Sequence, residues 1–158
     1  GRIIMPPHIH MASDHAGFAL KSALMLRLAS LGYDLEDHGA HSADSCDYPV
    51  YARRLCNAVL QQRDRGDLGI LICGTGIGMS IAANRIPGIR AALCASEFQA
   101  RATRQHNDAN VLCLGERVTG TGLAFSITDA FLDTAFEGGR HQRRIDLIDH
   151  PDHSDHHA

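Results

Sequence analysis

Short apolar runs alternate with segments of helical periodicity along most of the chain. The first helical segment shows this clearly, because Leu20, Leu24, Leu28 and Leu31 recur at steps of three and four residues, the spacing of one helix face. Gly32 follows directly and predicts the end of that helix. On the same reasoning we expect strands at residues 9–13, 33–37, 68–73, 89–94 and 111–114, and helices at 18–31, 50–63, 79–85, 97–104, 120–136 and 140–148.

Regular alternation of strands and helices is typical of a parallel sheet covered on both faces. A chain of 158 residues with 44% hydrophobic residues suits one domain with its own core. We therefore predict an α/β fold, a single-domain three-layer α/β/α sandwich with a five-stranded parallel, Rossmann-like sheet, over residues 1–149. Residues 150–158 are rich in histidine and aspartate, and a disordered tail is favoured there over a metal-binding one.

Composition narrows the classes of partner. A net charge of −3 without a basic stripe argues against nucleic-acid binding, and the absence of tryptophan argues against a base-stacking platform. No apolar run is long enough for a membrane span, and residues 1–7 lack the apolar region of a signal peptide. We expect a cytoplasmic protein. Its five cysteines are odd in number and lack metal-type spacing, which suits reduced thiols and no metal site.

The segment from residue 70 to 84 is the most informative part of the chain. An apolar run ends in Cys73, and glycines follow at positions 74, 76 and 78 before a helical pattern begins. Such glycines let backbone N–H groups converge on an anion, and the helix start adds partial positive charge. The same dipoles favour a thiolate over a thiol. The sequence thus predicts a reactive sulfur beside an anion-binding loop.

Two common glycine loops do not fit this segment. Met79 stands where the dinucleotide-binding fingerprint has its last glycine. No lysine follows Gly78, as the phosphate loop of nucleotide hydrolases requires. The remaining alternative is a tight turn that only lets a helix pack closely on its strand.

Polar residues also lie beside the ends of the first and last predicted strands. Asp14 and His15 follow the first predicted strand, with a helix N-cap as the alternative role for Asp14. His106 and Asn107 precede the last predicted strand, where capping and turn roles are the alternative.

Two arginines near the carboxyl end of the chain suggest a phosphate clamp. Arg140 and Arg144 lie four residues apart on one predicted helix face, where they would repel each other unless an anion lies between them. A basic surface patch is the alternative. Together with the thiol and the histidines, the pair suggests proton transfer on a phosphorylated substrate, with the thiolate as base or nucleophile.

Five motifs in order resemble the type B ribose-5-phosphate isomerase family, which includes the galactose-6-phosphate isomerase subunits. The resemblance covers residues 8–148. It rests on Asp-His-Ala-Gly at 14–17, Asp-Tyr-Pro at 47–49, Gly-Ile-Leu-Ile-Cys-Gly-Thr-Gly-Ile-Gly at 69–78, Arg-Gln-His-Asn-Asp at 104–108 and Gly-Gly-Arg-His-Gln at 138–142.

The resemblance implies an enzyme of the pentose phosphate pathway. It would interconvert ribose 5-phosphate and ribulose 5-phosphate through an enediolate, without cofactor or metal. Cys73 would be the base that moves the proton between C2 and C1. Some members place a glutamate near the position of Ile77, whereas this loop has no carboxylate. His106 would assist ring opening. A branch acting on four-carbon sugars lacks that histidine, so its presence favours a substrate that cyclises.

The resemblance also implies binding roles and an assembly. Asp14 and Asn107 would bind sugar hydroxyls or the enediolate, and Thr75 would stabilise the oxyanion with the loop amides. The family forms homodimers or dimers of dimers whose active sites draw on both subunits. The expected catalytic residues are Cys73, His106, Asp14 and Thr75, and the expected substrate-binding residues are His15, Tyr48, Gly74, Gly76, Gly78, Asn107, Arg117, Arg140 and Arg144.

One departure and two alternatives remain. Ser13 precedes Asp14 where the family often has a glycine-cysteine pair, a change that affects packing more than chemistry. The alternatives are an isomerase of a six-carbon sugar phosphate (allose or galactose 6-phosphate) and a catalytically silent sugar-phosphate-binding protein.

Overall fold

Five parallel strands form the central sheet in the computed structural model, which describes residues 7–152. The central strand β3 (Leu68–Cys73) is buried along its whole length, which is why it reads as a continuous apolar run. The predicted α/β fold with a five-stranded parallel sheet is confirmed. In the order β2-β1-β3-β5-β4, the other strands are β2 (Leu35–Asp37), β1 (Ile9–Ser13), β5 (Val111–Gly115) and β4 (Ala91–Leu93).

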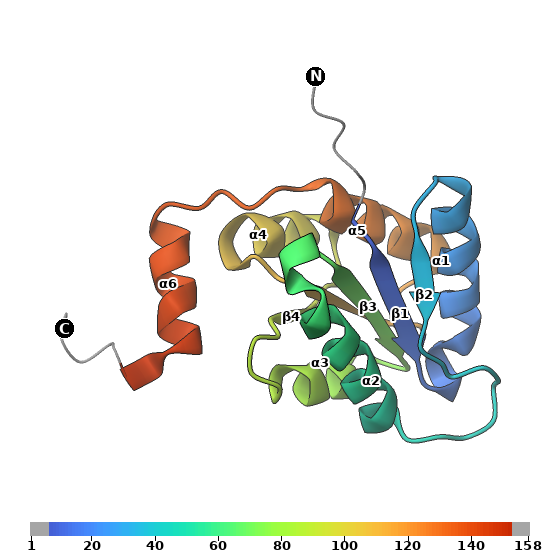
Figure 1. Cartoon of the computed structure of the whole chain (residues 1–158). Coiled ribbons are helices and arrows are strands. Elements are labelled where there is room, and N and C mark those ends of the chain that lie inside the picture. Colours follow the sequence, from blue (N-terminus) through green and yellow to red (C-terminus); the bar gives the residue numbers. More distant parts are fainter. Residues whose placement is uncertain (1–6, 153–158) are drawn as a thin grey trace.

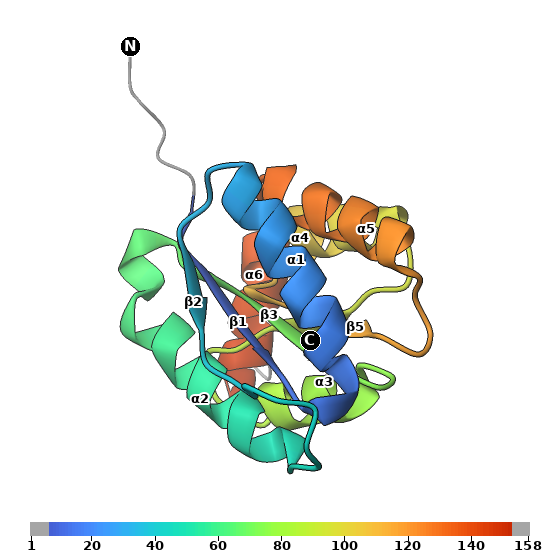
Figure 2. The same ribbon diagram turned by 90° about the vertical axis from the view of Figure 1, so that its right-hand side faces the viewer.

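Helices cover both faces of the sheet (Figure 2). Successive side chains of a strand point to opposite faces, so Ile70 and Ile72 pack in one core cluster while Leu71 and Cys73 pack in the other. The first cluster includes residues of α1 (Phe18–Ser30), α4 (Glu97–Asn107) and α5 (Thr121–Asp133), and the second includes residues of α2 (Tyr48–Gln61) and α3 (Ile77–Asn84).

The last helix stands apart from the sheet. The helix α6 (Arg140–Asp149) packs on α4 at the end of an extended linker (Figure 1). It ends where the predicted domain ends, at residue 149. Of the predicted tail, residues 153–158 lie outside the described part of the chain.

Several element ends differ from their predicted positions for local reasons. The helix α2 starts at Tyr48 rather than residue 50, because Pro49 is tolerated in a first turn, where its missing N–H is not needed. The helix α5 ends at Asp133 rather than residue 136, because Thr134 takes an extended backbone and its carbonyl accepts a hydrogen bond from Arg104 Nε at 3.3 Å.

The loop after β1 packs directly on β3 through Gly17. A Cβ at this position would lie 2.5 Å from the carbonyl oxygen of Ile72. Gly17→Ala should therefore lower the free energy of unfolding by about 1–3 kcal/mol, measured by urea denaturation. The matched control is Gly122→Ala in the first turn of α5, where an added Cβ meets nothing within 4 Å. The control should not lower stability, and equal stability of both variants would contradict the packing argument.

Candidate active site

Cys73 ends β3 at the start of the glycine loop. Its Sγ accepts a hydrogen bond from the Gly76 N–H at 3.1 Å. Gly76 has φ of 78° and caps α3, and a Cβ there would lie 2.5 Å from Leu93 Cδ1, so no other residue fits without strain. The helix begins directly after this turn. A backbone donor and the N-terminus of a helix thus both lie at the sulfur.

Three other cysteines lie in chemically inert surroundings. Burial raises the pKa of Cys56 to about 12 and that of Cys94 to about 11. Burial also raises the pKa of Cys113 well above its ordinary value. These thiols stay protonated at neutral pH and pack as small apolar groups. The reactive thiol predicted at Cys73 therefore has surroundings that they lack.

Asp14 and His15 lie beside the end of β3. The N–H of Asp14 donates to the carbonyl of Ile72 at 3.2 Å. Asp14 Oδ1 accepts from the N–H groups of residues 16 and 17 at 3.0 and 3.1 Å, which caps the 3₁₀ turn η1 (His15–Gly17). His15 Nδ1 accepts the Cys46 N–H at 3.2 Å. The capping role considered for Asp14 is thus present, and it fixes the carboxylate at the end of β1, beside the strand that ends in Cys73.

Tyr48, Arg117 and Thr75 surround the same loop. The Tyr48 ring packs over Gly78, where an added Cβ would lie 2.7 Å from Tyr48 Cζ. The Arg117 N–H donates to the Gly74 carbonyl at 3.0 Å, and its guanidinium lies over that glycine, with Nη1 3.2 Å from an added Cβ. Thr75 is exposed at the tip of the loop. One guanidinium and two side chains with hydroxyl groups thus lie around the glycine loop that follows Cys73.

His106 belongs to a second group. Its ring stacks on His141, with 4.5 Å between ring centroids and 15° between planes. His106 Nε2 lies 3.9 Å from Glu137 Oε1. Burial lowers the pKa of His141, and the charges of Arg140, His106 and Arg144 lower it further. The predicted phosphate-clamp arginines therefore lie close to the predicted ring-opening histidine.

The two groups lie at opposite edges of the sheet. The helix α4 runs back from the carboxyl ends of the strands to their amino ends, where the Asn107 carbonyl accepts from Arg90 Nε at 2.9 Å, directly before β4. In Figure 1 the arrowheads of β1 and β3 point away from α6. A single chain thus does not bring all the predicted residues together.

Each predicted residue falls into one of these groups. The carboxyl-edge group holds Asp14, His15, Tyr48, Cys73, Gly74, Thr75, Gly76, Gly78 and Arg117, and the amino-edge group holds His106, Asn107, Arg140 and Arg144.

Sequence reasoning missed the partners of His106. His141 lies inside the second glycine-rich motif, but nothing in the sequence indicates that its ring stacks on a residue of another helix. Within residues 7–152, two groups of histidine and glutamate also have possible ligand atoms within 4.8 Å of one another, although the sequence shows no metal-type spacing. They are His106, Glu137 and His141, and His8, His10 and Glu36.

A thiol that accepts a backbone N–H, with Arg117 and polar groups around the same loop, is equipped to move a proton on a small anionic substrate. The fold and the site define an isomerase of this kind. The chain belongs to the ribose/galactose isomerase family, whose sequence profile matches residues 9–148.

Individual relatives agree with this assignment. The chain is 47% identical to ribose-5-phosphate isomerase B of Escherichia coli over 89% of this chain and 93% of that one. It is similar to a crystal structure of a Thermotoga maritima ribose 5-phosphate isomerase, with a TM-score of 0.88, 52% identity and coverage of 92% and 99% of the two chains. The Mycoplasma genitalium enzyme with bound ribulose-5-phosphate matches with a TM-score of 0.89, 43% identity and coverage of 96% and 99%.

Proposed function

We propose that this chain interconverts ribose 5-phosphate and ribulose 5-phosphate through an enediolate. The observation that carries the proposal is the sulfur of Cys73, 3.1 Å from the Gly76 N–H at the start of α3. As a thiolate, Cys73 takes the proton from C2 and returns it to C1. The loop amides and Thr75 stabilise the negative charge that develops on the oxygen, as preorganised donors do in other enolising enzymes.

The remaining residues bind and prepare the substrate. Asp14 and Asn107 hold the sugar hydroxyls, and His106 assists opening of the furanose ring. Guanidinium groups suit the phosphate, because their fixed N–H donors match its oxygens. Phosphate binding is assigned to His15, Arg117, Arg140 and Arg144, with Tyr48 and the glycines of residues 74, 76 and 78 shaping the site.

A second copy of the chain completes this site in our proposal. The edge strand β4 is flanked by apolar side chains that a monomer leaves exposed, such as Phe98 at 73% and Ile148 at 64%. Leu93 on β4 and these two side chains line one cavity of about 610 Å³. Exposed apolar surface of this kind marks interfaces. A symmetric dimer through this edge would bring the amino-edge group of one chain to the carboxyl-edge group of the other.

The proposal extends to the cellular location of the protein and to its metabolic pathway. We place the protein in the cytoplasm and in carbohydrate metabolism, at the pentose phosphate pathway step that its substrate defines. Within residues 7–152 the structure contains no helix with the length and apolar character of a membrane span. Neither nucleic acid nor membrane is expected as a partner.

A turnover assay tests the substrate. Purified protein is compared on ribose 5-phosphate, allose 6-phosphate and galactose 6-phosphate, and kcat/KM should be highest for the first. One carbon is worth about 1–3 kcal/mol in a pocket, or about 10–200-fold, so the ranking is measurable. A higher value for a six-carbon substrate would replace the proposal with that isomerase. Absence of turnover on all three would point to a silent binding protein.

Mixing two inactive variants tests the shared site. Cys73→Ala and His106→Asn are unfolded and refolded together so that subunits exchange, and ribose 5-phosphate turnover is measured. Half of the dimers should be mixed, each with one intact site of two, so activity should return to about a quarter of the wild-type value. Each variant refolded alone is the control. If the mixture stays as inactive as the controls, each active site lies within a single chain.

A further inference from the structure

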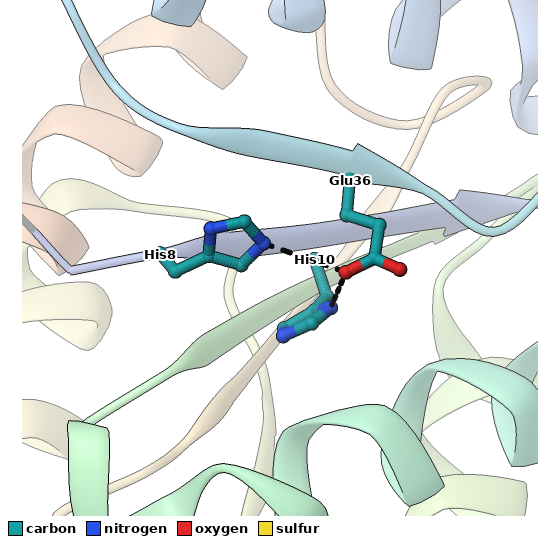
Figure 3. A group of neighbouring side chains, drawn as sticks. All are labelled: His8, His10 and Glu36. Atoms are coloured by element: carbon teal, nitrogen blue, oxygen red, sulfur yellow. Dashed lines mark ion pairs between the residues drawn. The ribbon is translucent and has the colours of Figure 1, made fainter.

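Three side chains converge at the amino end of β1, away from the candidate active site (Figure 3). His8 directly precedes β1, His10 lies on β1, and Glu36 is the register neighbour of His10 on β2. Glu36 Oε2 lies 3.4 Å from His8 Nε2 and 3.4 Å from His10 Nδ1. Two ring nitrogens and a carboxylate oxygen therefore point at one spot.

The two histidines are prepared differently for a ligand. His10 is 2% exposed, and its Nε2 lies 2.7 Å from Asp67 Oδ2. Because the carboxylate only accepts, Nε2 carries the proton and Nδ1 presents its lone pair to the group. His8 Nε2 is excluded from solvent and has no hydrogen-bond partner among residues 7–152. Buried nitrogens without a partner are rare in folded proteins, and each calls for an explanation.

We propose that His8 Nε2, His10 Nδ1 and Glu36 Oε2 bind a divalent transition metal, with Zn²⁺ as the best fit. Ligands about 2.0–2.1 Å from a tetrahedral zinc ion lie about 3.3–3.4 Å from one another, and both distances to Glu36 are 3.4 Å. Imidazole and carboxylate ligands suit zinc.

The surroundings supply an outer shell. Asp67 orients His10 in the carboxylate–histidine arrangement that accompanies many zinc ligands. Asp67 is itself held by Arg65, with Nε 2.6 Å from Oδ1 and Nη2 2.7 Å from Oδ2. These contacts lock the ring before the metal arrives.

A further histidine, His38, lies next to this group. His38 Nε2 lies 2.8 Å from His10 Nδ1 and 3.9 Å from Glu36 Oε1. It donates a hydrogen bond to His10, and it is not one of the three residues whose ligand atoms lie within 4.8 Å of one another. A metal ion on Nδ1 of His10 would displace this hydrogen bond, and the fourth position of a tetrahedral ion would be open to water.

The bound ion would join the edge of the sheet to its interior. The strand β2 has only three residues, and it would be tied to β1 through the metal and to the start of β3 through Asp67. Cys73 lies at the opposite end of the sheet. The site should therefore change stability, and it has no part in the proton transfer proposed above.

Zinc titration of the full chain tests the proposal. Histidines 153, 156 and 157 are replaced by alanine in the parent protein, because the tail can bind metal by itself. Calorimetry with ZnCl₂ should give one ion per chain, and Co²⁺ should give the visible absorption of a tetrahedral site. At a zinc concentration of one hundred times Kd, Tm should rise by about 5–10 °C.

A matched pair of variants separates this site from the other histidine–glutamate group. Glu36→Gln should weaken zinc binding at least about tenfold and, at the same zinc concentration, reduce the Tm shift by about half or more, and His8→Asn should do the same. Glu137→Gln removes the carboxylate from the group around His106 and should leave zinc binding unchanged. The proposal is overturned if Glu36→Gln and His8→Asn bind zinc like the parent, or if Glu137→Gln is the variant that loses it. If one of the two ligand variants fails to fold, the other still decides.

Discussion

Cys73→Ala should lower kcat for ribose 5-phosphate by about 10²–10⁴-fold, the usual contribution of a general base. In the proposed mechanism the Cys73 thiolate takes the proton from C2, and alanine offers no acceptor. Binding of a phosphate-containing competitive inhibitor should stay nearly intact, since the arginines and the loop amides are unchanged. Steady-state kinetics and inhibitor titration measure the two effects separately.

The control for this variant is a buried cysteine. Cys56→Ala removes a thiol whose pKa burial raises to about 12, so it should lower stability and leave kcat near the wild-type value. Alkylation with iodoacetamide gives an independent readout, because Cys73 should react before Cys56, Cys94 and Cys113, whose pKa values burial raises. Wild-type kcat in Cys73→Ala would show that another group is the base.

His106→Asn should separate ring opening from proton transfer. Ribose 5-phosphate is mostly a closed furanose, and its C2 proton becomes acidic only once the C1 carbonyl is free. The variant should therefore lose about 10²–10⁴-fold in kcat on ribose 5-phosphate. Ribulose 5-phosphate cannot close a five-membered ring, so exchange of its C1 proton with solvent should fall far less.

Both reactions are measured on the same protein, which makes each the control for the other. If His106 only capped the helix α4, stability would fall by about 0.5–2 kcal/mol and both reactions would suffer alike. If it were a phosphate ligand, KM would rise equally for both substrates. Equal losses in kcat would end the ring-opening assignment. The stacking of His106 on His141 and its approach to Glu137 show that it has partners beyond its own helix.

Local features explain why much of the fold, and the loop that carries the candidate thiol, could be predicted from the sequence. The strand β3 is apolar because both its faces are buried, and that pattern is visible without any partner. Gly76 needs a positive φ and leaves no room for a side chain, so a glycine there marks the turn. Cys73 lies three residues before Gly76, so the same local turn also fixes the position of the thiol. Residues 70–78 thus carry both the architecture and the thiol chemistry in one short segment.

Only the tertiary structure decided how distant segments meet. The order of the strands depends on which strands pair with each other, and this pairing cannot be read from the sequence of any one strand. His106 falls at the opposite edge from Cys73 because α4 reverses the direction of the chain, although both were expected to serve one substrate. The approach of His8 and His10 to Glu36 depends on the register between β1 and β2. The sequence by itself determined the α/β layers and the thiol loop, because local burial and backbone geometry dictate them. Strand pairing and helix packing join residues far apart in the chain, and they alone determined the division of the active site and the histidine–glutamate group.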